Sequence, residues 1–167
     1  MIVVLTGASG AGKTAIALAM ESRVRTFRFD TIGVPSPDVM ASYGSDHQPG
    51  GAWQRAMTLE WFARIAPLSE DVLFEGQMRL AFIVEAAAHV GVVARIVLVD
   101  CADDVRAARL SARGQPELAT TDMMRWAAYL RDEARTLEAV ILDTTSMSID
   151  QTVASVEQLF RARSNRS

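Results

Sequence analysis

Several residue types are scarce in this chain of 167 residues, and each scarcity argues against a class of protein. A single cysteine, Cys101, leaves neither a disulfide framework nor a cysteine-based metal cluster, and two histidines are too few for an evident zinc site. The net charge is -3, so the chain lacks the excess of basic residues with which proteins bind a nucleic-acid backbone. We therefore expect no nucleic-acid partner, although a nucleotide in a local pocket is compatible with this charge.

Long hydrophobic runs are also missing. The most apolar window, residues 81–99, is interrupted by Glu85, His89, Gly91 and Arg95, which fits a buried helix followed by a strand better than a membrane span. The first residues lack the basic region and the long apolar core of a secretory signal. We therefore expect a cytoplasmic protein with no membrane partner, and the sequence leaves its oligomeric state open.

Lysine is the scarcest basic residue, because Lys13 is the only lysine beside sixteen arginines. It lies in the stretch GASGAGKT, which fits the pattern G-x-x-x-x-G-K-[ST] and is flanked by an apolar segment and a helical one. Glycines let backbone N–H groups turn toward a phosphate, and a compact ammonium fits inside such a loop better than a planar guanidinium. The motif predicts a nucleotide-binding loop made of Gly7, Ala8, Ser9, Gly10, Ala11 and Gly12.

Two side chains of the motif have specific expected roles. Lys13 is expected to reach the β- and γ-phosphates of ATP, and the Thr14 hydroxyl to bind Mg²⁺. The alternative is a glycine-rich turn between a strand and a helix that binds nothing. Because the only lysine is at position 13, the chain cannot contain the N-K-x-D motif in which guanine-specific GTPases resemble one another, and that class is excluded.

Apolar bursts alternate with helical segments, the pattern of a parallel sheet covered by helices. Strands are expected at residues 2–6, 24–29, 72–75, 94–99 and 139–142, and helices at residues 13–22, 52–65, 80–89, 103–113, 122–137 and 149–163. In the second of these helices Trp53, Met57 and Trp61 recur every four residues, so we expect them in the core rather than in an aromatic platform. The segments 31–51 and 114–120 fit neither element and are expected to be lids or binding segments, with disorder as the alternative.

These features predict one α/β domain over residues 1–167. Its expected architecture is the three-layer P-loop NTPase fold, with a five-stranded parallel sheet flanked by helices and a small lid. An acidic residue ends two of the expected strands, Glu75 in DVLFEG and Asp100 in RIVLVD, and either can serve Mg²⁺ if its strand lies next to the phosphate-binding strand. Asp100 also precedes a helix, so a capping role is its alternative.

The segment EGQMR, residues 75–79, resembles the D-G-F-P-R segment of adenylate kinases and related nucleotide kinases. Glu replaces Asp in this chain, and Gln-Met replaces Phe-Pro. The resemblance implies that Glu75 and Arg79 belong to the site, with a solvated pair as the alternative.

The helix expected at residues 103–113 carries Arg106, Arg109 and Arg113 on one face and leads into the loop at 114–120. This arrangement resembles small P-loop kinases of the shikimate, gluconate, adenylate and chloramphenicol phosphotransferase type. The resemblance implies a lid at about residues 113–122, with Arg113 and Arg109 stabilising charge on the transferring phosphoryl group. A solvated helix face is the alternative for Arg106 and Arg109.

The resemblance also implies contacts with both substrates. Asp143, Thr144 and Thr145 follow the last expected strand, where these kinases place a loop against the adenine, and a plain strand-to-helix turn is the alternative. Asp30 ends the second expected strand, where a carboxylate can orient the acceptor hydroxyl and take its proton. An aspartate that initiates a turn is the alternative for Asp30.

The acceptor-binding region is expected at about residues 30–66. A nucleoside monophosphate acceptor requires converging arginines, for which Arg55 and Arg79 are candidates, whereas a neutral alcohol requires Asp30 as the base. The loop at 31–51 also offers two polar side chains for contacts with the acceptor, Asp46 and His47.

Together these features predict an ATP- and Mg²⁺-dependent phosphotransferase that moves the γ-phosphoryl group of ATP to a hydroxyl or phosphate of a small molecule. A nucleoside monophosphate or nucleoside kinase is a narrower alternative. A nucleotide-binding regulator or slow NTPase without an acceptor is an alternative of a different class. The sequence does not identify the acceptor.

Overall fold

The computed structural model of the protein describes residues 1–44 and 50–161. Asp46 and His47, two candidates for polar contacts with the acceptor that have a plain surface position as their alternative, lie outside these described residues. No helix in the described ranges is both long enough and apolar enough to cross a membrane.

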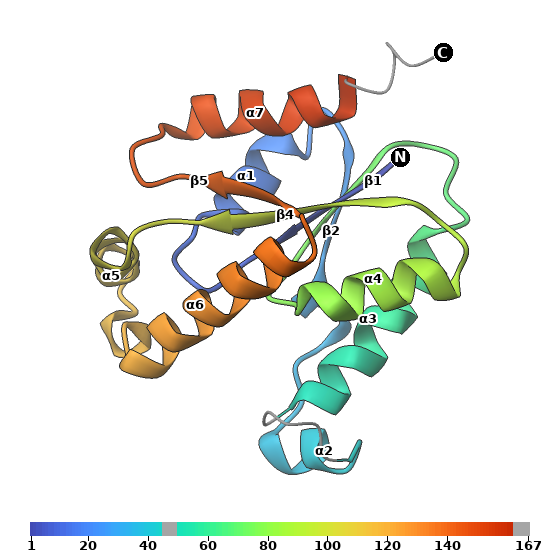
Figure 1. Ribbon diagram of the computed structural model, residues 1–167, viewed down its shortest axis with the longest axis horizontal. Coiled ribbons are helices and arrows are strands. Elements are labelled where there is room, and N and C mark those ends of the chain that lie inside the picture. The colour runs from blue at the N-terminus through green and yellow to red at the C-terminus, as the bar shows by residue number, and fades with distance from the viewer. Residues whose placement is uncertain (45–49, 162–167) are drawn as a thin grey trace.

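Five parallel strands form the central sheet (Figure 1). They are β1 (Ile2–Thr6), β2 (Arg25–Arg28), β3 (Val72–Glu75), β4 (Ala94–Asp100) and β5 (Val140–Asp143), in the spatial order β2-β3-β1-β4-β5. The middle strand β1 is buried along its whole length, and its Val4 is paired with Phe74 on one side and Ile96 on the other. The predicted five-stranded parallel sheet is thus confirmed.

Helices cover both faces of the sheet (Figure 1). Helices α1 (Lys13–Met20) and α7 (Ile149–Arg161) pack on the face that carries Val3 and Leu5 of β1. Helices α3 (Gly51–Ile65), α4 (Leu80–His89) and α6 (Thr121–Thr136) cover the opposite face. The predicted three-layer α/β fold follows from this alternation, because successive side chains of a strand point to opposite faces.

The aromatic stripe of helix α3 lies in the core, as we predict from its spacing. Trp53 and Trp61 are buried against the sheet beside Phe74, and Met57 is partly buried against the same cluster. The indole nitrogen of Trp61 donates a hydrogen bond to the carbonyl of Phe29 at 3.1 Å. This contact ties helix α3 to the end of strand β2, next to the position where Asp30 leaves the sheet.

The remaining elements lie at the carboxyl end of the sheet, where ligands bind in open parallel α/β folds. They are the short helices η1 (Phe29–Ile32), α2 (Pro37–Ala41) and η2 (Pro116–Leu118), and the longer helix α5 (Asp103–Ala112). The expectation that residues 31–51 lack a helix is wrong for α2. Its five residues include none that is buried, so it carries no periodic apolar signal that a sequence pattern could reveal.

Candidate nucleotide and acceptor site

The glycine-rich loop lies between strand β1 and helix α1, the context that the motif requires. Gly7 has a φ of 148°, and a Cβ at this position would collide with the carbonyl oxygen of Val99. Gly10 has a φ of 82°, and a Cβ there would lie 2.9 Å from Cγ of Arg106. The loop is therefore packed too closely against strand β4 and helix α5 for larger residues at these two positions.

Lys13 is buried at the first turn of helix α1, with 8% of its surface exposed. Its ammonium donates a hydrogen bond to the carbonyl of Ala8 at 3.2 Å, across the loop. Burial lowers the pKa of Lys13 from 10.5 to about 8, because the nearby carboxylates of Glu75 and Asp30 offset only part of the desolvation cost. A buried cation with too little negative charge around it fits a polyphosphate ligand.

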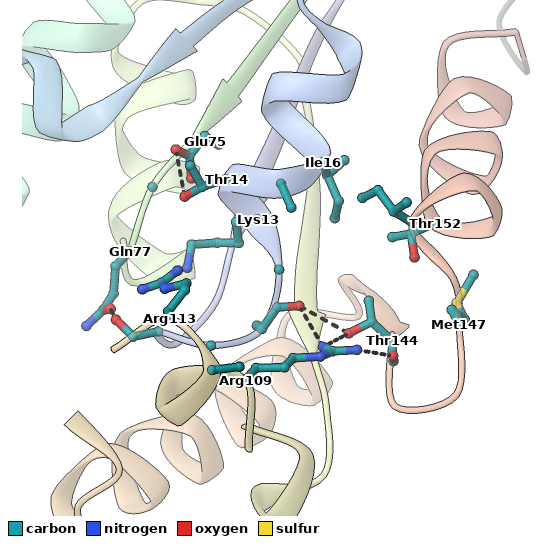
Figure 2. Close-up of a pocket in the computed structure, with 18 of the residues that line it drawn as sticks. Lys13, Thr14, Ile16, Glu75, Gln77, Arg109, Arg113, Thr144, Met147 and Thr152 are labelled. Atoms are coloured by element: carbon teal, nitrogen blue, oxygen red, sulfur yellow. Dashed lines mark hydrogen bonds between the residues drawn. The ribbon is translucent and has the colours of Figure 1, made fainter. Parts of the chain in front are cut away.

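Thr14 and Glu75 form the other part of the predicted phosphate site. The Thr14 hydroxyl lies 3.5 Å from a carboxylate oxygen of Glu75, at the end of strand β3 (Figure 2). Glu75 is buried, and this burial raises its pKa, whereas the charge of Lys13 acts in the opposite direction. A hydroxyl and a carboxylate side by side are oxygen donors of the kind that Mg²⁺ prefers, so these two residues fit the metal.

Asp100 has a different role from Glu75, although both strands adjoin β1. Its two oxygens accept hydrogen bonds from Arg106 at 2.7 Å and Arg131 at 2.6 Å. Residue Ala102, not Asp100, occupies the capping position of helix α5. Asp100 therefore serves as the shared anion of two arginines.

Arg106 is completely buried, so the alternative of a solvated helix face is wrong for this residue. Its guanidinium donates to the carbonyl of Ser9 at 2.9 Å and to the carbonyl of Cys101 at 3.2 Å, in addition to Asp100. A charge at zero exposure needs such partners, because an unpaired buried ion is strongly destabilising. Arg106 thus holds the backbone of the glycine-rich loop from its buried side.

Arg109 joins the same loop to the segment after strand β5. Its guanidinium donates to the hydroxyl of Thr144 at 2.9 Å and to the Thr144 carbonyl at 2.8 Å. The Thr144 hydroxyl in turn donates to the carbonyl of Ala11 at 3.1 Å (Figure 2). Of the three residues predicted near the adenine, only Thr144 lines the cavity that Lys13 and Thr14 also line, called here the first cavity. Asp143 instead accepts hydrogen bonds from the Thr145 backbone at 2.9 Å and from the Thr145 hydroxyl at 2.5 Å.

Arg113 and Asp30 complete this first cavity, which has a volume of about 480 Å³. The Arg113 side chain reaches the part of the cavity that holds Lys13 (Figure 2), and its Nε donates to the side chain of Gln115 at 3.2 Å. Asp30 lies on the short helix η1 and lines the same cavity. The structure therefore gathers the loop, Thr14, Glu75, Asp30, Arg109 and Arg113 around one space.

The lining of this cavity also includes residues that the sequence analysis does not identify, among them Gln77, Met147, Ile149 and Thr152. Gln77 accepts a hydrogen bond from the Ser9 hydroxyl at 3.1 Å, although the sequence offers only its position in EGQMR. Met147 lies just before helix α7, and Ile149 and Thr152 lie in its first turns. Such residues cannot be distinguished from core or turn residues in a single sequence, so no pattern could have identified them.

A second cavity of about 610 Å³ lies between the start of helix α3, the segment after strand β3 and helix α6. Arg79 lines this cavity rather than the first one, and its guanidinium lies over the rings of Phe82 at 4.8 Å and Tyr129 at 5.2 Å. Arg55 lines neither cavity and donates to Glu85 at 2.7 Å on the exposed surface. Of the two arginines predicted to bind an acceptor phosphate, only Arg79 thus lines one of these two cavities.

Comparison with solved structures identifies the fold. A gluconokinase from Sinorhizobium meliloti 1021 is 17% identical, with a TM-score of 0.71 over 99% of this chain and 96% of that chain. A shikimate kinase from Acinetobacter baumannii, in complex with shikimate, is 17% identical, with a TM-score of 0.64 over 99% and 95% of the two chains. A deoxyadenosine kinase from M. mycoides is 10% identical, with a TM-score of 0.66 over 97% and 100%.

No protein-family model and no curated protein sequence matches this chain. The likeness to these solved structures extends over nearly the whole chain, and at 10% to 17% identity it shows a shared fold. The chain therefore has the α/β three-layer fold of small P-loop kinases.

Proposed function

We propose that the protein is an ATP- and Mg²⁺-dependent phosphotransferase that phosphorylates a hydroxyl group of a small molecule. The observation that carries this proposal is the convergence of opposite charges on one cavity. Lys13 and Arg113 supply cations where the phosphates would lie, and Asp30 supplies a carboxylate in the same space. We further propose that residues 1–167 form one kinase domain with a lid at about 113–122 and an acceptor-binding region at about 30–66.

In this proposal the acceptor oxygen attacks the γ-phosphorus of ATP, and the bond from that phosphorus to the oxygen bridging to the β-phosphate breaks, so that ADP leaves. The hydroxyl proton passes to the Asp30 carboxylate and from there to water. Lys13, the loop N–H groups and Arg113 stabilise the charge that spreads over the transferring group. When bound beside Thr14 and Glu75, Mg²⁺ would neutralise part of the phosphate charge.

A phosphate acceptor, as in a nucleoside monophosphate kinase, finds less support than a hydroxyl acceptor. Such an acceptor requires several arginines directed at one phosphate. Arg55 instead pairs with Glu85, and Arg79 pairs with Glu133 at 3.4 Å. A regulator without an acceptor would need no carboxylate near Lys13 beyond the one proposed for Mg²⁺, Glu75, so the additional carboxylate of Asp30 favours an enzyme.

The test is acceptor-dependent turnover. The purified chain is incubated with ATP and Mg²⁺, first alone and then with pools of sugars, cyclitols, nucleosides and nucleoside monophosphates, and ADP and phosphorylated products are measured. We expect one hydroxyl-bearing pool to increase ADP release and to yield a phosphate ester. ADP release that no pool changes would support the slow NTPase, and a response only to monophosphates would support the nucleotide kinase.

A further inference from the structure

The second cavity adjoins the proposed phosphoryl-transfer site. Gln77 lines both cavities, so a molecule in the second one can extend a group past Gln77 toward Lys13 and Asp30. The volume of about 610 Å³ lies within the range of small-molecule sites. Its walls come from three separate parts of the chain, and helix α6, which supplies one wall, has no place in the sequence-based acceptor region.

Every cation that lines the second cavity has a carboxylate partner. Arg79 pairs with Glu133 at 3.4 Å, and Glu133 also accepts a hydrogen bond from the backbone of Leu80 at 2.7 Å, which holds that carboxylate in place. Arg125 pairs with Asp122 at 3.3 Å, one turn earlier on helix α6. Among the described residues, both arginines of the lining already have a carboxylate within ion-pair distance, so an anionic ligand would have to compete with Glu133 and Asp122 for them.

The uncharged part of the lining is aromatic and amide-bearing. The rings of Trp126 and Tyr129 are stacked, with centroids 5.5 Å apart and an angle of 12° between their planes. Gln54 donates to the carbonyl of Gln77 at 2.8 Å and accepts from the backbone of Arg79 at 3.0 Å, so it holds the wall in shape. In the part of the chain that the structure describes, the Gln77 amide nitrogen has no hydrogen-bond partner and can donate to a ligand oxygen.

We propose that the second cavity is the acceptor subsite and that its ligand is an uncharged ring compound bearing several hydroxyl groups. This inference rests on the proposed phosphotransferase function and specifies its acceptor. Aromatic walls pack against the apolar faces of such a ring, and the balanced arginine–carboxylate pairs and amides bind its hydroxyls. Sugars, cyclitols and nucleosides share this chemistry, and one hydroxyl would face Asp30.

Matched acceptor pairs that differ in charge test the proposal. Glucose is compared with glucuronate, and deoxyadenosine with its 5′-monophosphate, by ADP release from Mg²⁺-ATP. In each pair that supports turnover, we expect the uncharged member to have a kcat/KM at least about tenfold higher, because an anion must compete with Glu133 and Asp122 for the described arginines. myo-Inositol serves as a third, purely alicyclic probe. Equal or better turnover of a charged member would overturn the inference and leave the phosphotransferase function intact.

Binding measurements separate this inference from the proposed function. The same pairs are titrated while tryptophan fluorescence is followed, with Trp126→Phe identifying the signal that arises at the second cavity. Tighter binding of the uncharged members without any turnover would contradict the phosphotransferase and support the inference. If no uncharged probe binds, or if a charged member binds more tightly, the inference fails.

A variant that removes one carboxylate tests the balance between arginines and carboxylates in the second cavity directly. Asp122→Asn removes the partner of Arg125, so we expect the preference for the uncharged member of each pair to fall by about threefold at low ionic strength. Asp132→Asn is the matched control, because Asp132 forms the same kind of exposed pair with Arg135 on the same helix but does not line the cavity. An equal effect of both variants would contradict the role of the Asp122–Arg125 pair.

Discussion

The two halves of the candidate site are held in different ways. On the phosphate side, buried side chains bind backbone carbonyls of the loop: Arg106 holds Ser9, Lys13 contacts Ala8, and Thr144 holds Ala11. On the acceptor side Gln54 and Glu133 also bind the backbone, but the arginines of the lining are held by ion pairs between side chains, Arg79 with Glu133 and Arg125 with Asp122. One half of the site is therefore a fixed backbone cradle, and the charged groups of the other half belong to exchangeable side-chain pairs.

This difference matches the two ligands that we propose. A polyphosphate has the same shape in every nucleotide, so a rigid ring of N–H groups can be prepared for it in advance. An acceptor differs from one enzyme to another, and side-chain pairs can be altered without changing the loop. Changes on the phosphate side should therefore affect nucleotide binding and stability together, whereas changes on the acceptor side should affect acceptor use alone.

The largest effect should come from Lys13. Lys13→Ala removes the only ammonium in the cradle, and we expect kcat/KM for ATP to fall by about 10³-fold, because Lys13 meets charge that develops on the phosphoryl group. Lys13→Arg is the control that keeps the charge but adds bulk, and it should also be severely impaired. Full activity of the alanine variant, measured by ADP release, would overturn the assignment of the loop.

Asp30→Asn should lower kcat for a hydroxyl acceptor by about 10²-fold, the usual contribution of a positioned base. Nucleotide affinity, measured by calorimetry, should stay within about twofold, because Asp30 lies on η1, outside the glycine-rich loop. Asp38→Asn on helix α2 is the matched surface control. An unchanged kcat in Asp30→Asn would exclude this carboxylate as the base.

Arg106→Met tests the buried support of the cradle. The variant leaves Asp100 with only Arg131, so we expect a loss of about 3 kcal/mol in the free energy of unfolding. The Ser9 carbonyl also loses its donor, and nucleotide affinity should fall about tenfold. Arg135→Met, which removes an exposed pair with Asp132, should change the free energy of unfolding by less than about 1 kcal/mol when both variants are unfolded in urea.

Much of the phosphate side could be predicted from the sequence, because its geometry is local. The motif, its flanking strand and its flanking helix are contiguous, and a strand-loop-helix unit places Lys13 and Thr14 without further information. The choice between Glu75 and Asp100 could not be made in this way, since both end strands that adjoin β1. Only the partners of Asp100, on helices α5 and α6, distinguish the two carboxylates.

The acceptor side was harder to predict, because its parts are distant in the sequence. Helix α6 meets the segment at 77–79 through Glu133, which is 54 residues beyond Arg79. Arg106, Arg109 and Arg113 look equivalent on a helical wheel, yet one is completely buried and another contacts Thr144 across the cavity. Which arginine meets which partner depends on the packing of helices, and a single sequence carries no signal for it.

The pH dependence of nucleotide binding should be smaller than these mutational effects near neutrality. Lys13 has a pKa of about 8 in the free protein, below its ordinary value of 10.5, and a bound polyphosphate favours the protonated form. Affinity should therefore be constant well below pH 8 and fall by up to about tenfold per pH unit above it. Calorimetry at pH 7, 8 and 9 in buffers of different ionisation enthalpy should detect proton uptake on binding at pH 8 and 9. An affinity that does not change with pH would contradict this environment for Lys13.

The smallest effect should come from Arg55, compared with Arg79. Arg55→Gln removes an exposed pair with Glu85 outside both cavities, so we expect acceptor KM to change by less than about twofold and stability by less than about 1 kcal/mol. Arg79→Gln changes the wall of the second cavity, where the guanidinium lies between two aromatic rings, and KM should rise several-fold at nearly constant nucleotide affinity. Equal effects of the two variants would show that the division into a backbone cradle and a side-chain pocket does not describe acceptor binding.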